Sequence, residues 1–480
     1  MRRGAFIAIL AGLTAGCAHA PLPQSATGQP ELPQTFLHAP DNASARALDT
    51  LLPIDDASFL DLAASALDSS PTLGQALARI ESARASARRA SAGRLPQSSV
   101  TGNVTVSRTN PGQFGQNNPF AALIDTEQIA YGANVVASWD PDIFGQLRAN
   151  ERSAIAQLEA ATASAAAVRI ALLAEIAASV TDWRTLDARL LYARRDLAAA
   201  NQIASLLRIR QQAGLATGID HHIAEAQADA ARSRIAALDD ERVRIVARLV
   251  ALTGQDAHWV NSTLQQGGPT PRPRVAPASL PSQLLMNRPD LLAASARLAA
   301  SDAALDAAAR TRFPKLTLSA ALGLLAFDPG DLFDEQSIVG SLAAGIAAPL
   351  LDFGRIEAEI NRAEAEKMLA FEAYRGAVFQ ALADAEAAYG LVETSDRQAS
   401  HAEAEREALE RATSLANARY RSGLSSLVEV LEARRAADAS GERAALALGR
   451  AERARILLWQ ALGGGEFGAV DYPTTRSTSQ

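Results

Sequence analysis

The sequence predicts a mainly α-helical chain with a small β part, built from two copies of one design. Two runs of 69 residues, from Phe144 to Gln212 and from Phe353 to Arg421, contain no proline. Between Phe371 and Val392 apolar residues recur every three or four positions, which is the seam of a coiled coil. At about 1.5 Å per residue, each run would form a helix about 100 Å long. A helix of that length needs neighbouring helices of similar length to bury its apolar face.

The two halves of the chain match at two constant spacings. Three pairs of residues are separated by 209 positions: Phe144 and Phe353, Gly214 and Gly423, and Gly254 and Gly463. Four pairs further upstream are separated by 218 positions: Pro71 and Pro289, Leu73 and Leu291, Arg94 and Arg312, and Pro96 and Pro314. Seven pairs on two constant spacings indicate an internal duplication. The nine extra residues of the first repeat must lie between Pro96 and Phe144, where Asn110 to Pro119 reads as a long loop.

Each repeat would contain the same parts in the same order: an entry helix, a β-hairpin, a long helix, a tip turn and a return helix. The first repeat would span residues 71–254 and the second residues 289–463. In both repeats polar and apolar residues alternate over about ten positions per strand. This alternation predicts β-hairpins at 97–139 and 315–348.

Four strands of about ten residues with one apolar face have the length and pattern of membrane barrel strands. A soluble hairpin that packs one face on helices would show the same pattern. A closed barrel needs roughly eight strands or more, and open sheet edges are not tolerated in lipid. A chain with four strands must therefore share a barrel with other copies, and three copies would supply twelve strands. The helices of three copies would likewise form a tube of antiparallel columns.

Composition narrows the classes of function. The chain has 480 residues, a net charge of -7 and 21% charged residues, which argues against nucleic-acid binding. No stretch reads as the roughly 18 apolar residues of a membrane-spanning helix, so we expect any membrane crossing to use strands. Walker loops, dinucleotide-binding glycines, zinc spacings and nucleophile elbows are not found, so we expect neither an enzyme nor a cofactor. His221 and His222 invite a metal interpretation, but adjacent helical residues point about 100° apart, which leaves only a site shared between copies.

The N-terminal region reads as an export signal. A basic start and an apolar stretch over residues 1–16 precede Cys17, the one cysteine, so no intramolecular disulfide is possible. Ala15-Gly16-Cys17 resembles a lipobox, in which the thiol is acylated, although Thr14 replaces the usual leucine. An ordinary signal with an incidental cysteine is the alternative. Residues 17–70 would be an extended lipidated segment with a short helix, 255–288 a Pro-rich linker and 464–480 a tail.

Several motifs together resemble the TolC-like outer-membrane efflux proteins, specifically the NodT-type lipoproteins that serve resistance-nodulation-division pumps. The resemblance covers nearly everything from Cys17 to Gly463. The segments that carry it are the lipobox-like Ala15-Gly16-Cys17, Leu280-Pro281-Ser282-Gln283-Leu284-Leu285, Arg288-Pro289-Asp290, Trp139-Asp140 with Asp142-Ile143-Phe144-Gly145, and Tyr420-Arg421-Ser422-Gly423-Leu424-Ser425 followed by Val428-Glu429-Val430-Leu431-Glu432-Ala433. Asn287 stands where the family usually has the first of two arginines.

The resemblance implies a trimeric α-helical barrel of long antiparallel helices, continuous with a 12-stranded membrane β-barrel. It implies an outer-membrane protein that is lipid-anchored at Cys17 and extends into the periplasm. Ala18, which follows the cysteine, favours the outer membrane over retention in the inner membrane. Its function would be a passive exit duct, with a periplasmic adaptor and an inner-membrane resistance-nodulation-division transporter as partners. The alternatives are the outer-membrane channel of a type I secretion system and, in a different class, a lipid-anchored periplasmic helical scaffold.

The resemblance also implies sites at the tip turns. The adaptor would dock at Gly214-Leu215 and Gly423-Leu424, although a glycine there also serves simply to reverse the chain. The residues that would close the periplasmic gate are Asp220, Tyr420, Arg421, Glu429 and Glu432. Glu429 and Glu432 stand where the family usually has aspartates, and they share one helix face. The alternative interpretation is a solvated helix start, where acids are favoured by a few tenths of a kcal/mol.

Overall fold

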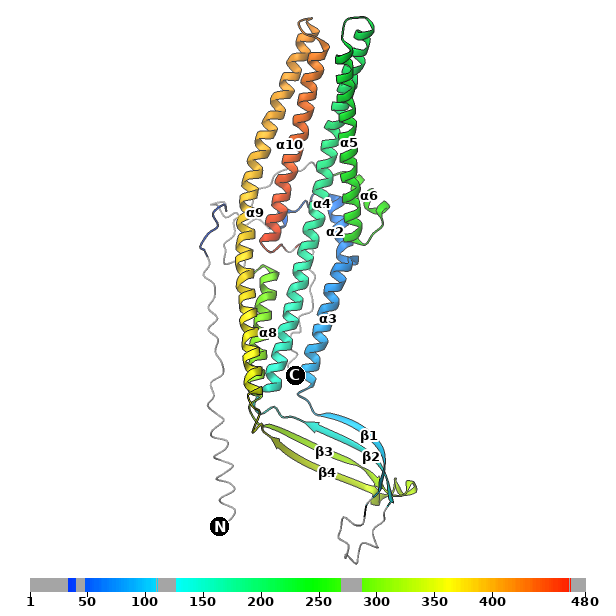
Figure 1. Ribbon diagram of the computed structural model, residues 1–480, viewed down its shortest axis with the longest axis vertical. Coiled ribbons are helices and arrows are strands. Elements are labelled where there is room, and N and C mark those ends of the chain that lie inside the picture. Colours follow the sequence, from blue (N-terminus) through cyan, green and yellow to red (C-terminus); the bar gives the residue numbers. More distant parts are fainter. Residues whose placement is uncertain are drawn as a thin grey trace, which may run out of the picture. The chain divides into compact units, whose positions relative to one another are not determined.

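The computed structural model describes residues 33–39, 48–108, 110, 127–268, 287–465 and 467 (Figure 1). The predicted signal peptide and Cys17 lie outside these residues. So do most of the predicted linker, most of the predicted tail and most of the predicted loop between Asn110 and Pro119. The described chain falls into two compact units. We call them the sheet unit, Glu81–Glu159 with Ala296–Glu372, and the hairpin unit, Gln29–Ile80 with Ala160–Ser295 and Ala373–Gln480.

The sheet unit contains one antiparallel sheet in the order β1-β2-β3-β4 (Figure 1). The strands are β1 (Gln97–Arg108), β2 (Glu127–Trp139), β3 (Lys315–Ala326) and β4 (Ile338–Ala347). Two short 3-10 helices, η4 (Pro329–Asp331) and η5 (Glu335–Ser337), connect β3 to β4. The unit also holds the end of α3 (Pro71–Ala92), most of α8 (Pro289–Arg310) and the first turns of α4 (Gln146–Gln212) and α9 (Arg355–Arg421).

The hairpin unit contains two helical hairpins whose turns lie at the same end of the unit (Figure 1). One hairpin joins α4 to α5 (Gly218–Thr253), and the other joins α9 to α10 (Leu427–Ala461). The smaller elements are η1 (Leu48–Leu51), α2 (Ala57–Ser69) and α6 (Ala257–Gln265). Helix α6 shows that the segment predicted as a linker begins with regular structure. The predicted mainly α-helical fold with four strands is confirmed.

The duplication is also present in the hydrogen-bonding pattern of the sheet. In the β1–β2 pair, partner numbers add up to 235, as in Gln97 with Ser138. In the β3–β4 pair they add up to 662, as in Lys315 with Ala347. Adding 218 to the residue numbers of β1 and 209 to those of β2 raises the sum from 235 to 662, so the two hairpins have the same register. The two sequence spacings are therefore also structural spacings.

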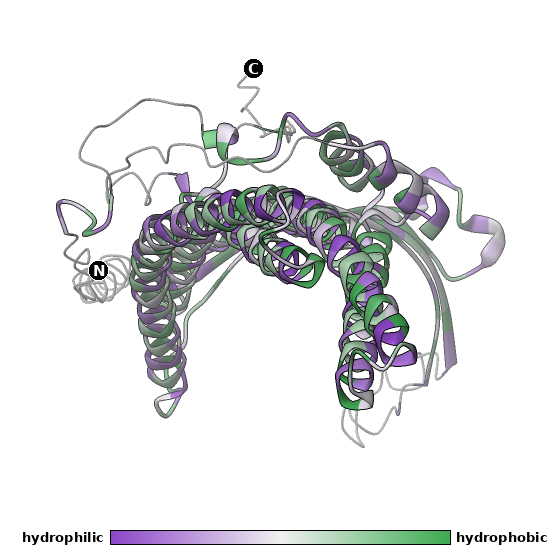
Figure 2. Ribbon diagram, turned by 90° about the horizontal axis from the view of Figure 1, so that it is seen from above, coloured by the Kyte–Doolittle hydropathy of each residue, from purple (hydrophilic) through white to green (hydrophobic). Residues whose placement is uncertain are grey.

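The core of the hairpin unit forms where α4 meets α2, α5, α6 and α10. Its fully buried side chains include Leu173, Ile176 and Val180 of α4, and Leu458 and Trp459 of α10. The expectation that no stretch is apolar enough to span a membrane is wrong for α4, which contains one such 18-residue stretch. That stretch is 61% buried inside the folded chain, as expected for the core helix of a helical unit. Figure 2 shows hydrophilic and hydrophobic residues interleaved along the helices.

Helix α10 packs closely against α4 because glycine stands at two contact positions. A Cβ atom at Gly441 would lie 2.3 Å from the Tyr192 ring, and one at Gly449 would lie 2.2 Å from the Thr185 hydroxyl. The positions 209 residues earlier, on α5, are Arg232 and Asp240, whose side chains are both more than half exposed. The return helices of the two repeats have therefore diverged where one of them meets α4.

We expect Gly449→Ala to lower the free energy of unfolding by about 1–3 kcal/mol, because the added methyl group overpacks the contact with Thr185. Gly376→Ala on α9 is the matched control, since nothing lies within 4 Å of its added Cβ and alanine favours helix by about 0.5–1 kcal/mol. Denaturant unfolding followed by circular dichroism measures both. Equal stability of the two variants would contradict the close packing.

Candidate docking and gating site at the helix turns

The two hairpin turns have the same backbone geometry. At the end of α4, the amide of Leu215 donates to the carbonyl of Arg210 (2.7 Å) and the amide of Gly214 donates to the carbonyl of Gln211 (2.9 Å). At the end of α9, Leu424 donates to Arg419 (2.9 Å) and Gly423 donates to Tyr420 (2.9 Å). Both glycines have φ of 72°. This is the Schellman motif, which ends a helix with a residue in the left-handed conformation that glycine adopts without strain.

Each return helix then starts with a capping box. On α5 the Thr217 hydroxyl accepts from the amide of Asp220 (3.2 Å), and the Asp220 carboxylate accepts from the amide of Thr217 (3.1 Å). On α10 the Ser426 hydroxyl accepts from the amide of Glu429 (3.3 Å), and the Glu429 carboxylate accepts from the amide of Ser426 (3.4 Å). Reciprocal bonds of this kind satisfy backbone donors that a helix start leaves free.

The turns expose an apolar side chain at equivalent positions. Leu215 is 77% exposed and Leu424 is 70% exposed. Each leucine follows its glycine directly, so the structure brings the predicted docking residues together as two equivalent pairs, Gly214-Leu215 and Gly423-Leu424. An exposed leucine on a rigid turn offers apolar area to a partner without ordering new backbone.

The predicted gate acids are held locally. The hydroxyl and the amide of Thr217 lower the pKa of Asp220, because both donate hydrogen bonds to its carboxylate. Glu432 lies 3.9 Å from Arg435 on the same helix. Tyr420 is 40% exposed and Arg421 is exposed at the end of α9. Among the described residues, no ion pair joins any two of the five predicted gate residues.

Sequence reasoning missed the side chain that ties the two hairpins together near the turns. Arg435 of α10 donates to Asp196 of α4 (2.8 Å) and to Gln227 of α5 (2.7 Å). Both Arg435 and Asp196 are largely buried, so this ion pair is less screened than an exposed one. Arg435 follows Glu432 by three residues, so its proximity to the predicted gate acid was readable, but its partners on α4 and α5 were not.

His221 and His222 both contact the carboxylate of Glu225. His221 Nε2 lies 3.3 Å from Glu225 and His222 Nδ1 lies 3.1 Å from the other oxygen of the same carboxylate. The two rings stack with centroids 5.5 Å apart. Within the part of the chain that the structure describes, no group of three or more histidine, cysteine, aspartate or glutamate side chains has the geometry to hold a metal ion.

Asp438 is a buried acid between α10, α4 and α9. It is 6% exposed, and its Oδ2 atom has no hydrogen-bond partner. Burial, helped by the nearby charges of Asp196 and Glu410 and opposed by those of Arg434 and Arg195, raises the pKa of Asp438 to about 6. No sequence motif marks this aspartate, because its pKa depends on burial between helices.

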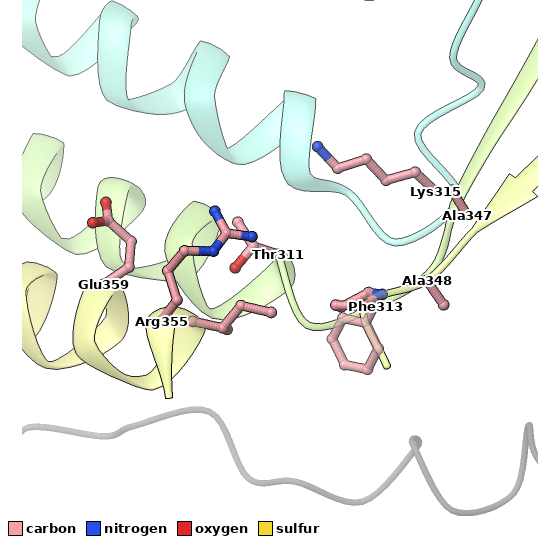
Figure 3. Close-up of a pocket in the computed structure, with 9 residues that line it drawn as sticks. Thr311, Phe313, Lys315, Ala347, Ala348, Arg355 and Glu359 are labelled. Atoms are coloured by element: carbon pink, nitrogen blue, oxygen red, sulfur yellow. The ribbon is translucent and has the colours of Figure 1, made fainter. Parts of the chain in front are cut away.

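The sheet unit has a pocket of about 520 Å³ at the end of β4 (Figure 3). Thr311 and Phe313 line it from the segment between α8 and β3, and Arg355 and Glu359 line it from α9. Ala348, also in the lining, stands 209 positions after Trp139. In the first repeat the Trp139 indole donates to the carbonyl of Arg94 (2.9 Å). The second repeat has only a methyl group at the equivalent position.

The described residues combine long helical hairpins with a four-stranded antiparallel sheet whose outer strands are exposed. The profile of the family described as Outer membrane efflux protein matches residues 62–255 and 280–464. The chain is 32% identical over 402 residues to the pyoverdine export outer membrane protein OpmQ of Pseudomonas aeruginosa, covering 83% of this chain and 84% of that protein. It is 30% identical over 481 residues to the outer membrane protein OprJ of the same species, covering 97% of each.

A solved structure shares the fold of the chain. The crystal structure of a membrane protein from Pseudomonas aeruginosa matches with a TM-score of 0.81 and 27% identity, covering 92% of this chain and 99% of that one. The chain therefore belongs to the outer membrane efflux protein family, which comprises efflux ducts and not enzymes. The predicted family, outer-membrane location and efflux function are confirmed. The fold class, a helical barrel joined to a β-barrel, is confirmed as well.

We expect Asp438→Asn to raise the thermal stability at pH 7.5 and to leave it nearly unchanged at pH 4. Because the pKa of Asp438 is raised in the folded state, the folded chain binds more protons than the unfolded chain between about pH 4 and 6. Stability therefore falls as the pH rises through this window, by about 1–3 kcal/mol. Melting curves at both pH values measure the difference.

The exposed carboxylate of Asp239 provides the control, and Asp239→Asn should change little at either pH. A melting difference between Asp438→Asn and the unchanged protein that is the same at pH 4 and pH 7.5 would rule out a buried acid with a raised pKa.

Proposed function

We propose that three copies of the chain form a passive exit duct of a tripartite efflux pump. A periplasmic adaptor would dock on the tip turns, and an inner-membrane resistance-nodulation-division transporter would supply the energy, since the sequence has no nucleotide-binding motif. Acylation of Cys17 would anchor each copy to the outer membrane. The observation that carries the proposal is the pair of equivalent turns, each a Schellman motif followed by an exposed leucine and a capping box.

Docking at the turns is supported by rigidity and exposure together. Each turn is fixed by two backbone hydrogen bonds and followed by a capping box, so its leucine needs no rearrangement to meet a partner. Three copies would present six such leucines, three from Leu215 and three from Leu424. Repetition of weak contacts raises the overall affinity strongly when all can form at once.

Gating would use the acids that follow the turns. Three copies would place six carboxylates of Glu429 and Glu432 around one axis. Individual exposed ion pairs contribute about 0–1 kcal/mol, so such a gate would be closed weakly, and adaptor contacts would suffice to open it. Asp220, Tyr420 and Arg421 would complete the constriction, and Arg435 would keep the two hairpins of one copy together.

We expect the double variant Glu429→Gln with Glu432→Gln to raise single-channel conductance in planar bilayers at least about twofold, because it removes the carboxylates whose charged contacts would hold the constriction closed. Glutamine also serves in a capping box, so the start of α10 is preserved. Glu407→Gln on α9 removes one exposed charge away from the turns and is the control. Unchanged conductance in the double variant would mean that these acids do not form the constriction.

We expect Leu215→Ser with Leu424→Ser to abolish efflux while leaving bilayer conductance unchanged, because the turns would lose their apolar contact area but keep their backbone. A deletion strain complemented with the variant and tested against dyes, antibiotics and metals measures efflux. The matched control is Leu215→Met with Leu424→Met, which retains an apolar side chain and should restore efflux. Normal efflux in the serine variant would exclude docking through these leucines.

A further inference from the structure

The hairpin unit has a pocket of about 390 Å³ between α4, α5 and α10. Apolar side chains from all three helices line it, since Leu186 and Ile245 are buried and Leu446 is half-buried. Arginines from α4 and α5 line the same pocket. Pockets of this size with apolar walls and a few charged groups suit small organic molecules.

Arg189 of α4 is the least exposed of the three arginines that line the pocket. Its guanidinium donates to Glu241 and to Glu442, each at 3.3 Å, and its side chain is 18% exposed. Two carboxylates therefore already balance the single positive charge of Arg189, so this arginine has little charge to offer a ligand.

Arg244 and Arg248 are the two arginines that a ligand could engage. They stand four residues apart on α5, so they share one helix face, and they are 73% and 43% exposed. Their ion-pair partners, Asp240 at 2.6 Å and Glu175 at 3.3 Å, do not line the pocket. Exposed ion pairs are weak, so a bound anion can replace these partners at little cost.

The pocket lies on the side of α4 that faces away from α2 and α6. Arg184 of α4 donates to Asp56, just before α2, and to the carbonyl of Leu264 in α6. The pocket residues Asp182 and Arg189 point about 160° and 140° away from Arg184 around the helix.

This placement decides which way the pocket would face in the duct. In a tube of about twelve helical columns spaced by about 9 Å, the helix axes would enclose a circle only about 35 Å across. Three copies of α2 and α6 would fill the bore if they faced inward. The opposite face of α4, with the pocket, is therefore the one that would line the bore.

We propose that this pocket binds an organic carboxylate with an apolar body, and that it selects such solutes for passage. The forked guanidinium groups of Arg244 and Arg248 match the two oxygens of a carboxylate, and the apolar body would pack on Leu186, Ile245 and Leu446. The role in passage rests on the exit duct proposed above, whereas the binding itself does not.

The second repeat lacks this pair of arginines. The position 209 residues after Arg248 is Leu457, which is 46% exposed. The position 209 residues after Arg244 is Arg453, which forms an ion pair with Asp182. Arginines that only kept the helix surface hydrated would be expected in both repeats, so their restriction to the first repeat favours a binding role.

Calorimetric titration of the full-length protein in detergent at pH 7.5 tests the ligand class, with titration into protein-free detergent as the blank. The probes are 2-naphthoate, its neutral counterpart 2-naphthamide, and acetate, which has the carboxylate without the apolar body. We expect 2-naphthoate to bind at least tenfold more tightly than either of the others. Equal binding of 2-naphthoate and 2-naphthamide would overturn the role of the carboxylate.

Two double variants locate the binding. Arg244→Gln with Arg248→Gln should weaken the binding of 2-naphthoate at least tenfold and leave that of 2-naphthamide unchanged. Arg232→Gln with Arg411→Gln removes the same charge from two exposed arginines outside the pocket and is the matched control. Equal weakening by both double variants would reduce the effect to overall charge and overturn the site.

The bore placement is tested separately in planar bilayers. 2-Naphthoate should interrupt the current of the unchanged protein reversibly and should not interrupt that of Arg244→Gln with Arg248→Gln. Binding that leaves the current of a conducting channel unaltered would overturn the role in passage. Binding by a protein that conducts no ions would instead contradict the exit duct and support the pocket alone.

Discussion

The backbone of a sheet edge cannot remain without hydrogen-bond partners in a lipid environment, and this constraint governs the rest of the molecule. The part of the chain that the structure describes supplies four strands with two unpaired edges, which is half of the roughly eight strands of the smallest closed barrels. In the proposed trimeric duct other copies would complete the sheet, and the helices would follow the same symmetry. The exposed apolar residues on β1 and β4 fit a sheet that is completed by other copies.

Within the hairpin unit the helices are held by contact at short range. Glycines at two positions let α10 approach α4, and Arg435 connects α10 to Asp196 of α4 and Gln227 of α5. A second buried arginine, Arg184 of α4, donates to both oxygens of Asp56 at 2.8 and 3.0 Å and so fixes the segment before α2. These contacts keep the two hairpins of one copy in a defined arrangement, while the turns themselves remain free to meet a partner.

Much of the fold was predictable because duplication and periodicity are properties of the sequence itself. The two spacings, the four strands and the glycines at the turns were readable, and the structure adds that the spacings hold in the hydrogen-bond register. The capping boxes were readable too, since Thr217 and Ser426 each precede an acid by three residues. The burial of Asp438 and the partners of Arg435 were not, because they depend on which helices meet. The apolar stretch in α4 was missed because alanines separate its larger apolar residues.

The difference between α5 and α10 shows that two repeats in one polypeptide can carry different residues at equivalent positions. Six identical single-repeat subunits would present one and the same helix surface at every boundary, so a glycine acquired there would narrow all six boundaries together. Two repeats in one polypeptide give two kinds of boundary, and each kind can carry its own substitutions. The two return helices differ in this way, since α10 has Gly441 and Gly449 where α5 has Arg232 and Asp240.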